Sequence, residues 1–262
     1  TTLSAQSAPR HTELPSREEL DSISIRGIAL YEYDRAAWEA TDALLKIAHP
    51  PPQDGGQYVV FRMDDFWYVD FGRLTAARDT FYTLYQEFRH EPDTTWFGGR
   101  TPSPSPNVKN LLHSARAVAT ALDAFGAVQK RPYNHVALPT ANGEWLVYLF
   151  PAQTVSTSWP LGGDERFRIS SDGLRILERH RMHNTVSVTP NNVRSESVGN
   201  KRVAYFQVNV TDNRPEDTDV LAVLSRTPSL PAYVGVDGYW VYRIDPDGRI
   251  RAPRKVTPPA NR

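Results

Sequence analysis

Three residues of this chain carry the side chains best suited to acid–base chemistry: His135, Asp164 and His183. An imidazole exchanges its proton near neutral pH, and a nearby carboxylate orients the ring and stabilises its charged form. Asp164 or Glu178 can orient a histidine in this way. The sequence therefore predicts that a catalytic or ligand-binding centre, if the protein has one, uses His135, Asp164 and His183.

The same residues also allow a structural interpretation. Asp164 follows two glycines and can stabilise a turn, and a histidine at a strand end often only hydrogen-bonds to the backbone. If this segment were a helix, His180 and His183 would lie on one face and could bind one metal ion. On a strand they face opposite sides. The preceding alternation and the Asp172-Gly173 turn favour a strand. No metal site and no cofactor is therefore predicted.

The motifs of common enzyme classes are absent from the sequence. It has no cysteine, which excludes thiolate catalysis, disulfides and Cys-ligated zinc. It has no Gly-x-Ser-x-Gly, no His-Glu-x-x-His and no glycine-rich phosphate-binding motif. The paired carboxylates Asp64-Asp65 are adjacent and would point to opposite faces of a strand. The standard hydrolase signatures are thus missing, and nucleotide binding by a familiar motif is excluded.

Charge and hydropathy limit the possible partners. Thirty basic and thirty acidic residues give a formal net charge of zero, which argues against nucleic acid as the main partner. Residues 31–97 are nonetheless acidic, with twelve acids and six bases. No apolar run approaches the roughly 20 residues that a membrane-spanning helix needs. The expected partner is a protein or a small molecule.

The elements that position these residues begin with three predicted helices. The clearest covers Pro106–Phe125, with Leu111, Ala115 and Leu122 on one apolar face. A second is predicted from Thr75, with Phe81, Leu84, Tyr85 and Phe88 on one stripe, and a third from Asp34. The segments 50–56 and 98–104 are rich in glycine and proline and are predicted as loops.

The second half is predicted to consist of closely spaced strands. Three strands centred on tryptophan follow Asx-Gly or Asp-Asp turns, at Trp67, Trp145 and Trp240. The predicted strands after residue 130 are His135–Leu138, Trp145–Pro151, Arg166–Ser170, Leu174–Arg181, Thr185–Thr189, Val203–Val210, Val220–Ser225 and Tyr239–Ile244.

This order of elements predicts an α+β protein in which a helix-containing N-terminal region precedes a mainly antiparallel, strand-rich region. The expected divisions are a flexible segment 1–20, a mixed region 21–130, a β-rich region 131–250 and a basic flexible tail 251–262. The first residues are small and lack an initiator Met, which suggests an exported, processed protein.

Several stretches resemble those of uncharacterised exported bacterial proteins. They include 133–139, 145–152, the Gly162–Gly173 segment and His183, preceded by 33–42. The resemblance implies export, to the periplasm or the outside of the cell, and no particular activity.

Two functional classes remain open. The favoured one is a non-catalytic module that binds a partner or ligand through an aromatic-rich sheet, because aromatic side chains supply large contact areas. The alternative is a cysteine-free, hydrolase-like enzyme built on His135, Asp164 and His183. Convergence of polar side chains in a cleft favours the enzyme, and an exposed apolar patch favours the binding module.

Overall fold

The computed structural model describes residues 13–46, 56–100, 108–126, 131–190 and 203–257. Within these residues the chain forms three α-helices and mainly antiparallel sheets. The predicted α+β class is confirmed, with a helix at the start and most strands in antiparallel pairs. No helix in this part of the chain is both long enough and apolar enough to cross a membrane.

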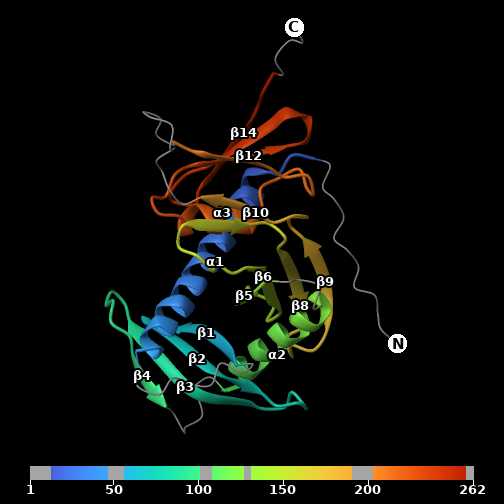
Figure 1. Cartoon of the computed structure of the whole chain (residues 1–262). Helices are drawn as coiled ribbons and strands as arrows, with labels where there is room; N and C mark the ends of the chain where they lie inside the picture. The colour runs from blue at the N-terminus through green and yellow to red at the C-terminus, as the bar shows by residue number, and fades with distance from the viewer. Residues whose placement is uncertain (1–12, 47–55, 101–107, 127–130, 191–202, 258–262) are drawn as a thin grey trace.

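Helix α1 (Arg17–Leu44) runs through the middle of the molecule and contacts elements from both halves of the chain (Figure 1). Ser16 caps it: its Oγ accepts the Glu19 N–H, and the Glu19 carboxylate accepts the Ser16 N–H at 2.7 Å. This capping box starts the helix well before Asp34, where the sequence predicted its start. The segment expected to be flexible through residue 20 is therefore helical from Arg17.

The first sheet has the antiparallel order β1-β2-β3-β4 and packs one face on α1. Its strands are β1 (Gln57–Met63), β2 (Phe66–Leu74), β3 (Phe81–His90) and β4 (Phe97–Arg100). The helix predicted from Thr75 is wrong, because this segment forms a turn followed by β3. Strand β3 pairs with β2 from Leu74↔Phe81 to Phe66↔His90. The predicted loop at 98–104 is also a strand as far as Arg100, and its remainder lies outside the described residues.

The second sheet has the antiparallel order β5-β6-β8-β9 and lies between two helices. Its strands are β5 (Tyr133–Pro139), β6 (Trp145–Pro151), β8 (Glu165–Ile169) and β9 (Ile176–Arg181). Helix α1 packs on one face, around Tyr148, and α2 (Val108–Phe125) packs on the other, around Phe167. The predicted helix at this position is confirmed from Val108, although Leu111 is its buried leucine and Leu122 is 39% exposed.

The third sheet has the order β11-β12-β13-β14, in which only the β11–β12 pair is parallel. Its strands are β11 (Tyr205–Val208), β12 (Ala232–Val236), β13 (Trp240–Ile244) and β14 (Ile250–Lys255), with a short 3-10 turn, η1 (Asp237–Tyr239), before β13. Helix α3 (Asp217–Ser225) connects the parallel pair. The strand predicted at Val220–Ser225 is thus helical, and the tail predicted to be flexible from residue 251 is a strand through Lys255.

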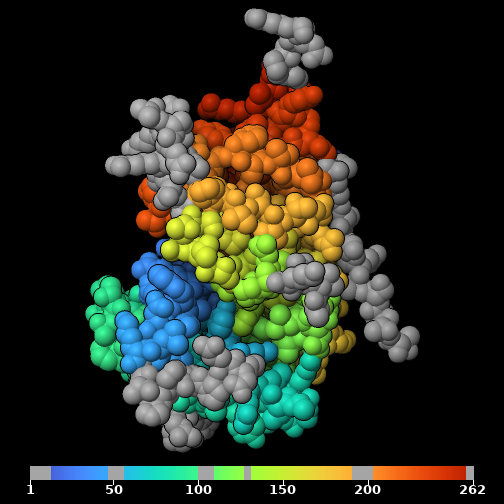
Figure 2. All heavy atoms as spheres, viewed as in Figure 1, coloured from blue at the N-terminus to red at the C-terminus, as the bar shows by residue number. Residues whose placement is uncertain are grey.

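Strands β7 (Ser158–Leu161) and β10 (Ser187–Pro190) form a separate two-stranded sheet. The main core cluster joins Leu30 of α1, Val60 of β1, Tyr148 of β6 and Met182. The regions on either side of the predicted boundary near Lys130 therefore share one core. Figure 2 shows the colours of successive segments in contiguous bands, from the β1–β4 sheet at the base to the C-terminal sheet at the top.

Candidate functional site

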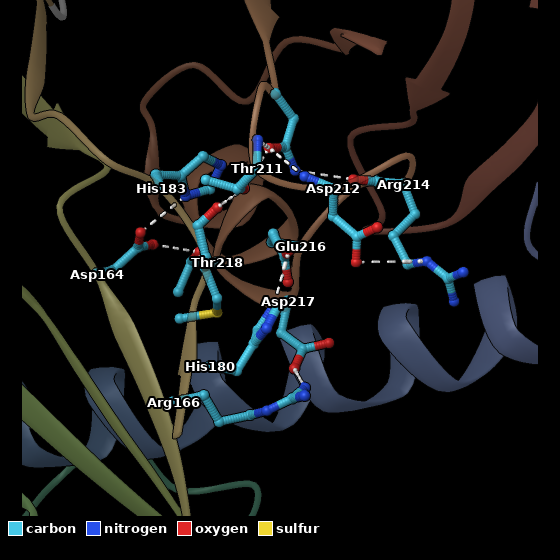
Figure 3. Close-up of polar contacts among 12 residues, drawn as sticks. Asp164, Arg166, His180, His183, Thr211, Asp212, Arg214, Glu216, Asp217 and Thr218 are labelled. Carbon is cyan, nitrogen blue, oxygen red and sulfur yellow. Dashed lines mark hydrogen bonds and ion pairs between the residues drawn. The ribbon is translucent and has the colours of Figure 1, made fainter. Parts of the chain in front are cut away.

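The structure brings together His183, two residues after the end of β9, and Asp164, the residue before β8. His183 Nδ1 lies 2.7 Å from Asp164 Oδ1, and the Thr218 hydroxyl donates to the other carboxylate oxygen (Figure 3). The second ring nitrogen, Nε2, lies 3.2 Å from Asp219 Oδ1 as an ion-pair contact without a hydrogen bond's alignment. Burial acts to lower the pKa of His183, but Asp164 and Asp219 outweigh it, so this pKa lies well above its ordinary value.

His135 does not join this pair. It lies on β5, and β6 separates β5 from β8, which places it about 10 Å across the sheet from the strand that follows Asp164. Its ring stacks on Tyr58, with centroids 4.0 Å apart, and its Nε2 contacts the Tyr58 carbonyl oxygen at 3.0 Å. Burial lowers the pKa of His135 to about 4. The structure therefore brings together only two of the three predicted residues, because strand order places His135 in the core.

Asp217, the first residue of α3, is a heavily bonded carboxylate that no sequence motif singles out. It accepts bonds from Arg26 Nε at 3.0 Å, Arg166 Nη1 at 3.1 Å and the Tyr148 hydroxyl at 2.8 Å. Burial acts to raise the pKa of Asp217, but the two guanidiniums outweigh it and the net shift is downward. Its side chain is only 1% exposed. Because its three partners lie on α1, β6 and β8, this buried network connects those elements to α3.

A second histidine–acid group lies beside this network and opens onto a pocket. His180 Nε2, on β9, lies 3.0 Å from Glu216 Oε1, and the Asp212 carboxylate completes a group whose ligand atoms lie within 4.8 Å of one another. Burial acts to lower the pKa of His180, but Glu216 outweighs it and the net shift is upward. All three residues line a pocket of about 490 Å³ between the first turns of α1 and the loop before α3. His183 and Asp164 are not among its lining residues.

The first sheet carries a row of aromatic rings on the face opposite α1. Each strand contributes one ring at directly paired positions, and successive centroids lie 5.1, 6.2 and 6.1 Å apart. The rings of this aromatic row belong to Phe61, Tyr68, Phe88 and Phe97. At one end Phe61 packs against the α2 cluster; at the other Phe97 is 54% exposed. The sequence reasoning missed the row because it assigned β3 to a helix.

No family model matches this chain, and no curated protein or solved structure is significantly similar to it.

Proposed function

We propose that this protein is a non-catalytic binding module that holds an extended, apolar segment of a partner protein on its aromatic row. The observation that carries this proposal is the open end of the row. Its outermost ring, on β4, stays more than half exposed although the neighbouring rings contact one another across the strands. Exposed aromatic side chains that form a continuous patch with neighbouring rings are typical of protein interaction sites.

The chemistry of the partner follows from what surrounds the row. Three carboxylates stand exposed on the turns at the Phe66 end of the sheet, at Asp64, Asp65 and Asp93. They favour basic residues beside the apolar ones, because opposite charges speed encounter and fix orientation. The row crosses four strands and has the length of about five extended residues. The favoured partner is therefore an extended segment with aromatic or aliphatic side chains and a Lys or Arg flank.

The competing enzyme proposal has one observation in its favour, the short contact between His183 and Asp164. Acid–base catalysis requires a ring nitrogen that can reach the substrate. Here Asp164 and Asp219 face both ring nitrogens, and the pair lies outside the pocket that His180 lines. We therefore interpret His183 as a structural residue that holds Asp164 and Asp219 together.

We also propose that the protein is exported. The support is the resemblance of several stretches to exported proteins, and fractionation of the source cells tests it.

Selection from a displayed library of random peptides tests the binding function. We expect the wild-type chain to enrich peptides that combine aromatic or aliphatic residues with Lys or Arg. Their affinity for Phe97→Ser should fall about tenfold or more, because an aromatic anchor residue contributes more than about 1.4 kcal/mol. Phe206→Ser is the matched control, since Phe206 is 67% exposed on β11 in another sheet. Equal binding to wild type and Phe97→Ser would reject the proposal.

A further inference from the structure

Three side chains from separate segments converge at the inner wall of the α1–α3 pocket. His180 comes from β9, Asp212 from the loop after β11, and Glu216 from the N-cap position of α3. Their ligand atoms all lie within 4.8 Å of one another. Asp212 and Glu216 are at most 4% exposed, so the fold itself places these carboxylates beside the imidazole.

The spacing suits a metal ion. Two ligand atoms at about 2.1 Å from a cation, at a right angle to each other, are about 3.0 Å apart. His180 Nε2 and Glu216 Oε1 are separated by 3.0 Å, so both can bind one ion with little movement. The Asp212 carboxylate lies within the same group and supplies the third ligand.

The charge of the pocket also favours a cation. Five carboxylates and three guanidiniums line it, so with His180 in the neutral form that binds a metal, the lining has an excess of two negative charges. The carboxylates belong to Glu18, Glu19, Glu178, Asp212 and Glu216, and the guanidiniums to Arg26, Arg166 and Arg214. A divalent cation at the inner wall balances that excess.

We propose that His180, Asp212 and Glu216 bind a divalent transition-metal cation of the Zn²⁺ or Mn²⁺ type. One imidazole with two carboxylates is a mixed nitrogen and oxygen set that suits these ions. Mg²⁺ prefers oxygen ligands and should bind more weakly. Three protein ligands leave further coordination positions, and because all three residues line the 490 Å³ pocket, a second ligand can reach the ion from there. This inference is independent of the aromatic row.

Calorimetric titration of the untagged, chelator-treated full chain tests the site. We expect one equivalent of Zn²⁺ or Mn²⁺ to bind, and Co²⁺ to give a visible absorption band from its bound form. His180→Gln, Asp212→Asn and Glu216→Gln should each weaken binding by about tenfold or more. Glu178→Gln is the matched control, because Glu178 lines the same pocket but is not one of the three proposed ligands. This substitution should leave the metal affinity within about threefold of wild type.

Two results would overturn the proposal. One is the absence of saturable, 1:1 binding tighter than about 1 mM by Zn²⁺ or Mn²⁺ in the wild-type chain. The other is undiminished binding by His180→Gln, which would place the metal elsewhere and leave the His180–Glu216 contact as a structural hydrogen bond. Should Glu216→Gln fail to fold, the wild-type Co²⁺ spectrum and its loss in His180→Gln decide the question.

Discussion

His135 should make folding stability depend on pH in a measurable way. Its pKa falls from the ordinary 6.5 to about 4 because the ring is buried against Tyr58. At about 1.4 kcal/mol for each tenfold change in proton affinity, this difference corresponds to about 3 kcal/mol. The unfolded chain takes up the proton first as the pH falls. The contribution is thus fully present above pH 6.5 and is lost as the pH falls through about 4.

A nearby carboxyl titrates with the opposite effect and must be separated from His135. Burial raises the pKa of Asp34 to about 6, against the opposing hydrogen bond from Asn134. The unfolded chain loses this proton first, so this contribution is present at low pH and is lost as the pH rises toward 6. A wild-type curve alone combines the two effects. The quantity to measure is therefore the wild-type curve minus that of His135→Gln, which retains a donor near the Tyr58 carbonyl.

The assay is urea unfolding followed by circular dichroism at pH 7 and pH 4. Wild type should lose about 3 kcal/mol more of its unfolding free energy between these pH values than His135→Gln loses. Any fixed cost of the substitution cancels in this comparison. His90→Gln, which removes a surface imidazole on β3, is the control. Parallel curves for wild type and His135→Gln, within about 1 kcal/mol, would show that the buried-histidine reasoning is wrong.

Three further substitutions test how the elements pack. Asp217→Ala leaves two guanidiniums without their buried partner and should cost about 3–5 kcal/mol in urea unfolding, whereas Asp123→Ala at the surface should stay within about 1 kcal/mol. Gly27→Val places a Cβ into Val220 where α1 meets α3, and it should lower the thermal midpoint by separating these helices. Leu111→Ala should cost about 2–5 kcal/mol by the same denaturation assay, because Leu111 is 3% exposed in the cluster beneath α2.

The strands that follow tight turns were the most predictable elements. Trp145–Pro151 was predicted with the bounds that β6 has, because Asn142-Gly143 supplies the turn and Gly143 takes a φ of +76°. The tryptophan strands at Trp67 and Trp240 are likewise in antiparallel pairs. Local chemistry sufficed in these cases.

Two elements, β3 and α3, were assigned the wrong type of secondary structure from local patterns. Apolar residues at 81, 84, 85 and 88 fit a helical stripe, but pairing with β2 and β4 makes the segment a central strand. Val220–Ser225 is an apolar run that reads equally as strand or helix, and α3 is buried nearly all round. Tertiary contacts decide both cases, and a single sequence does not display them.

The candidate site was predictable only where its members are close in the sheet. Asp164 and His183 meet because Asp164 lies directly before β8 and His183 shortly after its neighbour β9, with the Met182 N–H bonded to the Asp164 carbonyl. The partners of His180 come from residues 212 and 216, which reach it through the third sheet's connection to α3. No spacing in the sequence indicates that contact. His135 was grouped with this pair because the sequence does not show the strand order. Strand β6 was predicted, but its position between β5 and β8, which separates His135 from Asp164, was not.

The four residues Glu216–Asp219 connect the two histidine–acid groups, those of His180 and His183, to the start of α3. Successive side chains around the start of a helix point in different directions, about 100° apart. Glu216 contacts His180, Asp217 binds Arg26 and Arg166, and Thr218 bonds Asp164, while Asp219 caps the helix and approaches His183. One turn thus fastens α1, β8 and β9 to α3, and changes at residues 217–219 should alter stability first. His180 and Asp212 face the pocket instead, so substitutions there separate metal binding from folding most cleanly.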